Sequence, residues 1–350
     1  MIRRSSTSSS ESADRTLRRF LLCAGAMAAA PLILFLAAYM AMDPFKVLRW
    51  HEAPFEDRLG LNKGMLSVQA YERGGGASGY DSFIMGSSVS CAYSVEEWKS
   101  FLPDGARPLH MDSSSQTVST LRKFLEYLER DGASLRNVLV VFAPEVFGME
   151  YDGDNLSQLV PPVVENGGLS YDISFHCAYF MGFANYRYLS PFLEYKFMGS
   201  REETTEVPVF SPQPIVYDAS FNEESMPDWD SILDSDPALL HGDGMTILPP
   251  DASYRVIDPQ IDAVERADLE AIAEILSRNG ADYRVLLAPT PKLHLLSSAD
   301  ERVLFETFGE RFVNLARDFR AEQSDPSNFY DTIHYRPRLA SRYMRAAYDR

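Results

Sequence analysis

The chain has 350 residues, of which 45% are hydrophobic and 24% are charged, and its formal net charge is −17. This composition excludes a disordered chain and provides material for one large domain or two small ones. Residues 1–19 hold five arginines and two acidic side chains, so the rest of the chain carries −20. That charge argues against nucleic-acid binding, which depends on cationic side chains that meet phosphates.

An apolar run of 23 residues without a charged side chain, 20–42, is the first predicted element. As a helix rising about 1.5 Å per residue, it would cover a hydrocarbon core of roughly 30 Å. The serine-rich residues 1–19 are expected to form a disordered tail, which its arginines place in the cytoplasm by the positive-inside rule. Residues 43–80 are expected to link this transmembrane anchor to an extracytoplasmic domain.

A cleaved signal peptide is the alternative to a retained anchor. The apolar region of a signal peptide usually has about 7 to 15 residues and is followed by small residues at the cleavage site. The run at 20–42 is longer, and it offers Tyr39 and Met40 near the best cleavage position. We therefore expect a single-pass protein that keeps its anchor.

The three cysteines form no framework of disulfides or metal ligands. Cys23 lies inside the apolar run. Cys91 and Cys177 could pair in an oxidising compartment, but their separation and lack of pattern favour two buried free thiols. His110 and Asp112 could join Asp331 and His334 as metal ligands, yet no tight run of ligands supports such a site. We expect no metal and no cofactor.

From residue 81 onward, apolar strand-like runs alternate with helical patterns, which predicts a parallel sheet covered by helices on both faces. The expected strands are "SFIMG" at 82–86, "RPLHM" at 107–111, "NVLVVFAP" at 137–144, "YRVLLAP" at 283–289 and a last one within 311–319. The expected helices are 94–102, 117–132, 259–280, 298–308 and 336–350. The domain thus extends over 81–350.

The alternation breaks at about 146–256, and a compact domain does not normally carry so long a structureless loop. We therefore expect an insertion. Its first half, 171–199, is aromatic-rich and is expected to be helical, with its rings packed in a core rather than stacked on sugars. Its second half, 200–244, is acidic, punctuated by prolines and expected to be mostly irregular.

The stretch "DSFIMGSSVSCAYS" at 81–94 passes from a strand through Gly86, Ser87 and Ser88 into a predicted helix. Ligands gather at the carboxyl ends of strands in α/β proteins, so either serine is a candidate nucleophile. The structural alternative is that Gly86 permits the turn and one serine caps the helix.

Asp331 and His334 stand three residues apart in "NFYDTIHYRP", in a loop before the last helix. A serine nucleophile needs a base, and the base needs an acceptor that orients it. If Asp331 receives one ring N–H, His334 can turn its other nitrogen toward Ser88. The Asp-x-x-His pair alone is common in loops, but together with the serine motif it predicts a triad of Ser88, His334 and Asp331.

With "FIMGSSVS" as a first block, "FYDTIHY" as a last block and the strand order between them, residues 81–350 resemble the SGNH (GDSL-like) hydrolase superfamily. The resemblance is closest to its membrane-anchored bacterial branch, which includes the D-alanyl transfer protein of teichoic-acid modification and alginate O-acetylation proteins. It implies a three-layer, flavodoxin-like α/β fold. The family's Gly-Asp-Ser maps onto Gly86, Ser87 and Ser88, which makes Ser88 the expected nucleophile.

The chain departs from the family pattern at the oxyanion hole. The glycine of the second block is absent from "HMDSSSQT", and the asparagine of the third block is absent from "APEVFG". The Ser88 N–H should remain as a donor to the developing charge. Further donors are expected among Ser113, Ser114 and Ser115. Thr290 and Lys292, after the fourth strand, are candidates for contact with substrate, and a solvated loop is the alternative.

The resemblance implies extracytoplasmic acyl transfer at the bacterial cytoplasmic membrane. Ser88 would take an acetyl or similar acyl group as an ester, and a hydroxyl of an envelope polysaccharide or related polymer would accept it. A multispanning membrane O-acyltransferase is the implied partner. One alternative is an esterase that removes acyl groups from glycans with the same triad. Another is a catalytically idle scaffold or binding subunit of an envelope-modification complex, which the missing oxyanion residues favour.

Overall fold

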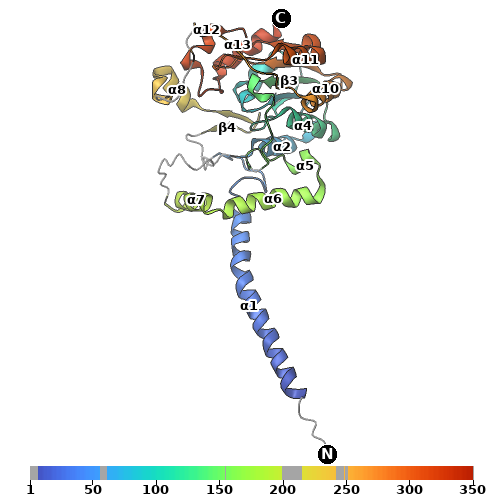
Figure 1. Ribbon diagram of the computed structural model, residues 1–350, viewed down its shortest axis with the longest axis vertical. Coiled ribbons are helices and arrows are strands. Elements are labelled where there is room, and N and C mark those ends of the chain that lie inside the picture. The colour runs from blue at the N-terminus through green and yellow to red at the C-terminus, as the bar shows by residue number, and fades with distance from the viewer. Residues whose placement is uncertain are drawn as a thin grey trace, which may run out of the picture.

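A five-stranded parallel sheet forms the centre of the fold and confirms the predicted α/β class (Figure 1). Consecutive apolar residues suit strands that are covered on both faces. β3, "NVLVVF", is buried at all six positions, and β1, "SFIMG", at all five. The strands are β1 (Ser82–Gly86), β2 (Pro108–His110), β3 (Asn137–Phe142), β7 (Asp282–Leu287) and β9 (Phe312–Asn314), in the order β2-β1-β3-β7-β9.

The computed structural model describes residues 7–55, 61–153, 155–198, 215–241, 248 and 251–349. Residues 1–6 of the predicted tail lie outside the described residues. So do 200–214 and 242–244 of the predicted irregular segment, 200–244.

Two groups of helices cover the sheet. In the first group, α4 (Val118–Arg130), α10 (Ala263–Arg278) and α11 (Ser298–Phe308) pack side by side. In the second, α3 (Val95–Lys99) packs on α13 (Pro337–Tyr348), with Trp98 Nε1 donating to the Tyr348 hydroxyl at 2.6 Å. Connections between parallel strands are right-handed, so the direction in which a connection runs along the sheet determines the face that its helix covers. The connection from β1 to β2, which holds α3, runs in one direction, and the connections that hold α4, α10 and α11 run in the other. The two groups therefore lie on opposite faces.

The direction of the strand order reverses at the carboxyl end of β1. Among the strands of this sheet the order is 2-1-3-4-5, one of the common doubly wound orders. β1 pairs with β2 on one side and with β3 on the other, so the winding reverses there. Ligands of open α/β sheets bind outside the strand ends at this reversal. Ser88 follows β1 directly at this point.

The insertion between β3 and β7 has elements of its own, and its aromatic first half is helical as predicted. The second half corrects the expectation of a mostly irregular segment, because Asn222 supplies a left-handed turn with φ of 59° and Pro227 begins a helix. The elements are α5 (Pro162–Glu165), α6 (Gly168–Ala184), α7 (Tyr186–Met198), the antiparallel pair β4 (Val216–Asp218) and β5 (Glu223–Ser225), α8 (Pro227–Ser235), α9 (Ala238–His241) and β6 (Arg255–Val256).

Short elements complete the described fold. These are η1 (Gly76–Ser78), η2 (Ser88–Ala92), η3 (Pro144–Val146), β8 (His294–Leu295), which pairs with β6, η4 (Gly309–Arg311), α12 (Arg320–Gln323) and η5 (Pro326–Asn328).

Residues 43–80, expected to be a linker, contain a helix of the domain. α2 (Lys63–Arg73) begins at Asn62, whose side chain accepts the N–H of Met65, and eight of its residues are buried. Three of these eight, Lys63, Ser67 and Gln69, are polar. Because its buried face is partly polar, the helix lacks the apolar periodicity that would have predicted it.

The N-terminal helix also corrects an expectation. α1 (Thr7–Met42) makes residues 7–19 helical rather than disordered. No glycine or proline interrupts these residues, and leucine, arginine and alanine favour a helix. The part Asp14–Met42 is long and apolar enough to cross a membrane.

A second hydrophobic cluster, separate from the core around the sheet, joins the end of α1 to α6 and α7. Phe35 and Tyr39 of α1 contact Phe180 and Phe183 of α6, with ring centroids 5.2 to 5.7 Å apart. The buried aromatic rings of residues 171–197 thus pack in a core, as predicted. The three cysteines are free, but Cys177 on α6 is exposed rather than buried as expected.

Candidate active site

Ser88 lies where the first strand meets the reversal of strand order. β1 ends at Gly86, where a Cβ atom would lie 2.5 Å from the carbonyl oxygen of Val141 on β3. Only glycine allows the two backbones to approach this closely. The chain then enters η2 at Ser88, which places this half-buried serine at the carboxyl edge of the sheet.

Ser87 and Ser88 differ in their hydrogen bonds and in their burial. Ser87 is buried, and its carbonyl oxygen accepts the N–H and the hydroxyl of Ser90 at 2.8 Å each. The side chain of Ser87 does not cap η2. Within residues 81–94, Ser94 caps a helix, because its hydroxyl accepts the Glu97 N–H at the start of α3. Capping therefore accounts for Ser94 but not for Ser88.

The structure brings Ser88, His334 and Asp331 together. Ser88 Oγ lies 2.7 Å from His334 Nε2, and His334 Nδ1 lies 2.6 Å from Asp331 Oδ2. The other carboxylate oxygen of Asp331 accepts the backbone N–H groups of Ile333 and His334 at 2.7 Å each. One carboxylate thus orients both the imidazole ring and the backbone of its loop.

The charge of Asp331 fixes the direction of these hydrogen bonds. Burial alone would raise the pKa of Asp331, but hydrogen bonds from the His334 ring and from the two backbone N–H groups outweigh burial and lower the pKa. An ionised carboxylate only accepts hydrogen bonds, so the proton lies on His334 Nδ1. Nε2 is then an acceptor, and the Ser88 hydroxyl donates to it.

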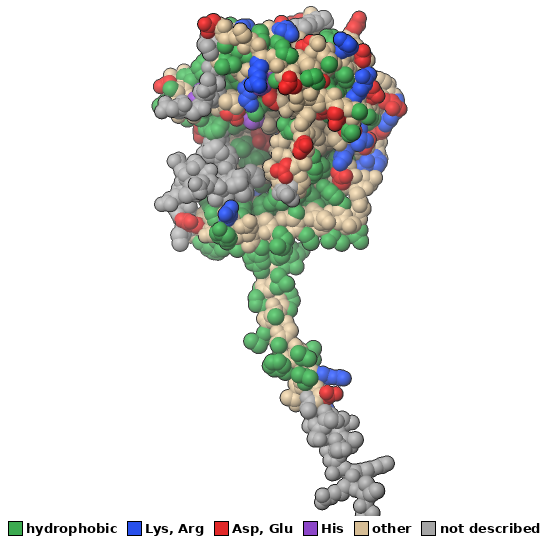
Figure 2. All heavy atoms as spheres, viewed as in Figure 1, with side chains coloured by type: hydrophobic (Ala, Val, Ile, Leu, Met, Phe, Trp, Pro, Cys, Tyr) green, Lys and Arg blue, Asp and Glu red, His purple; other side chains and the backbone are tan. Residues whose placement is uncertain are grey.

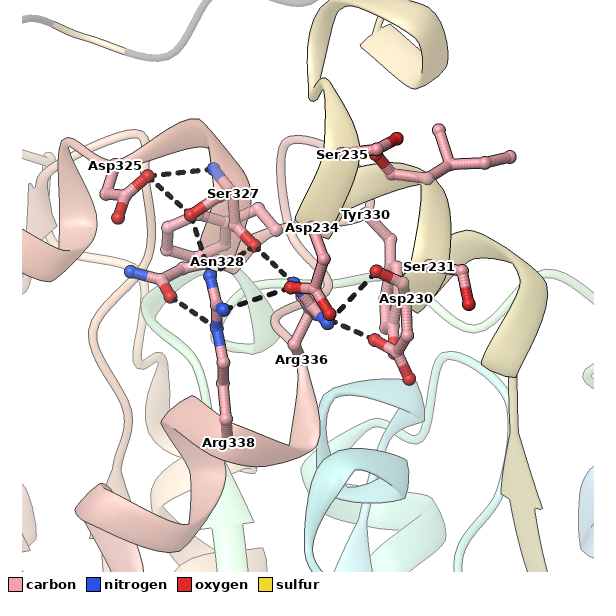
Figure 3. Close-up of polar contacts among 12 residues, drawn as sticks. Asp230, Ser231, Asp234, Ser235, Asp325, Ser327, Asn328, Tyr330, Arg336 and Arg338 are labelled. Atoms are coloured by element: carbon pink, nitrogen blue, oxygen red, sulfur yellow. Dashed lines mark hydrogen bonds and ion pairs between the residues drawn. The ribbon is translucent and has the colours of Figure 1, made fainter.

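Ion pairs hold the loop 329–335, which carries His334, against α8. Figure 3 shows the contacts of Arg336 and Tyr330 with this helix. Arg336, only 5% exposed, pairs with Asp230 and Asp234 of α8 through Nε and Nη1, at 2.7 Å each. The Tyr330 hydroxyl donates to Asp230 at 2.9 Å. Two nitrogens of the Arg336 guanidinium group bind two carboxylates of α8, which fixes the orientation of this group as well as its charge partner. α8, a helix of the insertion, therefore helps to position this loop.

The predicted oxyanion donors lie in the loop after β2, beside Gly86. Ser113 is buried, and its N–H donates to the Gly86 carbonyl at 3.2 Å, so that N–H is unavailable to a ligand. Ser114 and Ser115 are half-buried, and Ser115 has a left-handed backbone with φ of 48°. Strained backbone of this kind clusters at functional sites. The N–H of Ser88, which opens η2, has no partner within that helix.

Gln116 is a candidate that sequence reasoning missed. Its side chain is 2% exposed, and within the described residues neither its amide nitrogen nor its amide oxygen has a hydrogen-bond partner. Most buried polar groups are hydrogen-bonded, so a water molecule or a ligand would supply the partners that this amide lacks. A glutamine just before a helix carries no sequence signal of such a role.

A buried ionic cluster supports the same loop. Lys63 of α2 lies 2.9 Å from Glu224 and 3.7 Å from Asp112, and it donates to the Asn222 carbonyl at 2.9 Å. Burial would lower the pKa of Lys63, but the two carboxylates raise it above its usual value. The Cys91 thiol donates to the Asp112 carboxylate at 2.9 Å. The cluster therefore locks α2 and the β4–β5 pair against the loop after β2.

Thr290, one of the two predicted substrate contacts, belongs to a group around Glu145. Thr290 is buried and donates to Glu145 at 3.2 Å, and His294 Nδ1 lies 3.0 Å from the same oxygen. Glu145 and His294 line a cavity of about 410 Å³, and Lys292 is half-buried nearby in the chain. Within the described structure, no hydrogen bond joins this group to the Ser88 site.

His110 and Asp112 do not form a metal centre with the Ser88 site. His110 Nε2 lies 3.2 Å from Ser90 Oγ, and burial lowers the pKa of His110 to about 4. Over the residues that the structure describes, no group of three or more histidine, cysteine, aspartate and glutamate side chains could hold a metal ion.

No protein-family model matches the chain, and no curated protein matches it.

Proposed function

We propose that this protein is an SGNH-like serine acyltransferase that moves an acetyl or similar acyl group onto an envelope polysaccharide or related polymer. The observation that carries the proposal is the line of hydrogen bonds from Ser88 through His334 to Asp331, at 2.7 and 2.6 Å. This is the arrangement of a nucleophile, a base and the group that orients the base. The strand order and the position of Ser88 after β1 support the SGNH-type fold that the sequence resembles.

The reaction would proceed in two steps, acylation of Ser88 and transfer of the acyl group to the acceptor hydroxyl. His334 Nε2 accepts the hydroxyl proton of Ser88 as Ser88 Oγ attacks the acyl carbonyl carbon, and the donor group departs with that proton. The acceptor hydroxyl then gives its proton to Nε2 and attacks the ester. Ser88 leaves as an alcohol with the proton returned from His334. Asp331 stabilises the imidazolium in both halves without taking its proton.

The stabilisation of the tetrahedral oxyanion would come from the Ser88 N–H and from the loop after β2. Ser114, Ser115 and the unpartnered amide of Gln116 are the candidate donors there. Each donor of this kind can contribute about 10²-fold to 10³-fold in rate. These groups would replace the family glycine and asparagine that the chain lacks.

The openness of the site supports a polymer as substrate. The side chains of His334 and Asp331 are 33% and 49% exposed, so an extended chain can reach the reacting atoms. The same openness admits water and favours a second candidate, an acyl-glycan esterase in which water replaces the acceptor hydroxyl. An idle scaffold is the third possibility, since the family oxyanion residues are absent.

The proposed location is the outer surface of the bacterial cytoplasmic membrane. α1 would cross the membrane with its arginine-rich end in the cytoplasm. The domain would then meet an acyl group delivered by a multispanning O-acyltransferase, the partner that the family resemblance implies.

The test is single-turnover acylation of the purified full chain with p-nitrophenyl acetate. We expect one equivalent of nitrophenol to be released rapidly and acetyl to appear on Ser88 in a peptide mass spectrum. Addition of an envelope polysaccharide should divert the acetyl group from water to polymer hydroxyls. Acetate formation unchanged by any polymer would favour the esterase, and an unmodified Ser88 would favour the scaffold.

A further inference from the structure

The exposed side of α6 carries a row of apolar residues, and none of its exposed residues is lysine, arginine, aspartate or glutamate. The polar residues exposed on this helix are Ser170, Ser174 and His176. Leu169, Ile173 and Met181 are 74%, 55% and 65% exposed, and Cys177 between them is exposed too. These four residues recur every fourth position, so they form one stripe along the helix. We call them the α6 outward stripe. Asp172 is the one acidic residue among the 17 of α6, and it is half-buried.

The inward side of the same helix is apolar as well. Phe175, Tyr179 and Phe183 are buried in the second hydrophobic cluster. A surface helix of a soluble domain normally places charged residues toward water. α6 instead exposes a row of apolar side chains and no lysine, arginine, aspartate or glutamate, which suits a helix at a membrane interface. The chain carries 24% charged residues, so their near absence from α6 sets this helix apart.

The contacts with α1 fix the level of α6 relative to the proposed membrane span. A helix that enters a hydrocarbon core of roughly 30 Å at Phe20 leaves it after about 20 residues, near Tyr39. The α6 rings of Phe180 and Phe183 contact α1 at Phe35 and Tyr39. α6 therefore meets α1 inside the last turns of its apolar run.

The orientation of α6 matches this level. Figure 1 shows α6 and α7 lying across the end of α1, between it and the α/β domain. In Figure 2 hydrophobic side chains cover the side of this layer from which α1 emerges. Beyond α6, α7 exposes Tyr186 and Phe197 beside Arg187 and Lys196. Aromatic and cationic residues of this kind are enriched where a protein meets lipid headgroups.

We infer that the α6 outward stripe is immersed in the lipid bilayer, at the boundary of headgroups and acyl chains, with α6 parallel to the membrane surface. The inference rests on the proposed membrane span of α1. Lipid is the occupant because the stripe continues the apolar surface of α1 at the same level and carries no charge for a polar partner. A flat apolar helix face in that position buries its surface as interfacial helices do.

Lipid contact at α6 would hold Ser88 at a fixed height above the membrane. The Tyr179 hydroxyl of α6 accepts the Asn62 side-chain amide at 2.8 Å, and Asn62 caps α2. α2 in turn carries Lys63, which belongs to the ionic cluster under the loop after β2. Rigid contacts thus run from the membrane surface to the proposed nucleophile, which suits an acyl donor presented at the membrane.

The test is nitroxide accessibility in the full chain with Cys23→Ala and Cys91→Ser, which leaves Cys177 as the single thiol. The spin-labelled protein is placed in phosphatidylcholine nanodiscs without any partner. Oxygen concentrates in acyl chains, whereas a water-soluble nickel chelate is excluded from them. We expect the label on Cys177 to collide with oxygen more often than with the chelate, as an interfacial helix requires.

Two matched labels make the result decisive. A label introduced by Ser277→Cys with Cys177→Ala, on exposed α10, should show the opposite preference for the chelate. A label introduced by Leu32→Cys with Cys177→Ala, on α1, should prefer oxygen if α1 spans the bilayer. A water-accessible Cys177 label beside a lipid-exposed position 32 would overturn the inference alone. A Cys177 label that neither reagent reaches would also overturn it, since protein would then cover the stripe. Water accessibility at position 32 would instead contradict the membrane span.

Discussion

At the scale of single residues, the site depends on which atom carries the proton of the His334 ring. The carboxylate of Asp331 accepts from Nδ1 at 2.6 Å and from two backbone N–H groups, and these hydrogen bonds lower its pKa although the side chain is only half exposed. That leaves Nε2 to accept from Ser88 at 2.7 Å. In the proposed reaction, Asp331 would therefore act on Ser88 through His334.

The substitution Asp331→Asn tests this role. An amide that donates to Nδ1 would move the proton to Nε2 and turn the acceptor away from Ser88. We expect acylation of envelope polymer in cells to fall by roughly 10²-fold to 10⁴-fold at matched protein level. Ser87→Ala is the matched control on the neighbouring serine and should retain measurable activity. Loss of activity in the control with retention in Asp331→Asn would contradict the assignment.

A second residue-scale prediction concerns pH. Burial raises the pKa of Glu223 to about 7, although the Val95 N–H donates to its carboxylate and opposes the shift. Between the ordinary value of 4.5 and about 7, the folded state holds a proton that the unfolded state releases. The free energy of unfolding should therefore fall as the pH rises through this window.

Glu223→Gln should remove that part of the decline, because the amide cannot ionise yet keeps an oxygen that accepts the Val95 N–H. Denaturant unfolding of the full chain in detergent at pH 5 and pH 8 measures the effect. The variant should lose less stability than the parent over this interval. Parallel declines would show that Glu223 does not titrate there.

At the scale of elements, the insertion positions the site from two directions. α8 holds the loop 329–335 through Arg336, and the β4–β5 pair presents Asn222, which donates to the His110 carbonyl at 2.7 Å and to Ser67 Oγ at 2.9 Å. Both contacts join segments about 100 residues or more apart. The insertion therefore contributes contacts that hold the segments of Ser88 and His334 in position.

Arg336→Lys tests the contact of α8 with the loop. Lysine keeps the charge but cannot reach Asp230 and Asp234 with two nitrogens. A displacement of His334 by about 1 Å should lower the acyl-transfer rate by on the order of 10²-fold. Arg338→Lys is the control, because Arg338 is 45% exposed and exposed pairs contribute little. Equal rates for the two variants at matched protein level would refute a positioning role for Arg336.

Local patterns explain what the sequence could predict. β1 and β3 are largely apolar and buried throughout, and β7 ends in the buried run 285–287, so these strands can be predicted from the sequence. Asp331 and His334 lie within one short loop, so their pairing can be predicted as well. α2 was missed because its buried face includes Lys63, Ser67 and Gln69. The pairing of Arg336 with Asp230 spans 106 residues and leaves no periodic trace. Gln116 is unusual only through its burial without a partner.

At the scale of the whole molecule, charge and apolar surface divide the chain into two parts. The apolar stretch of α1 separates the arginines at its N-terminal end from a domain with a large negative charge (Figure 2). Arg49 lies at the other end of α1 and donates to the carbonyls of Met40 and Ala41. The proposal that the domain lies outside the cytoplasm rests on this distribution of charge.

The topology can be measured in intact spheroplasts. Protease added from outside should digest the domain after residue 42, because in the proposed orientation the positive-inside rule would keep the N-terminal arginines in the cytoplasm. A cytoplasmic protein serves as the control for intact membranes. Protection of the domain, or a soluble form that begins near Met42, would contradict a retained anchor with this orientation.

The most direct test of the central claim is labelling of Ser88 by a fluorophosphonate, which reacts with serine hydroxyls activated by a neighbouring base. The full chain should be labelled at Ser88, and labelling should disappear in Ser88→Ala, nearly disappear in His334→Ala and persist in Ser87→Ala. A folded protein that is not labelled, or labelling that survives Ser88→Ala, would contradict an activated nucleophile at Ser88.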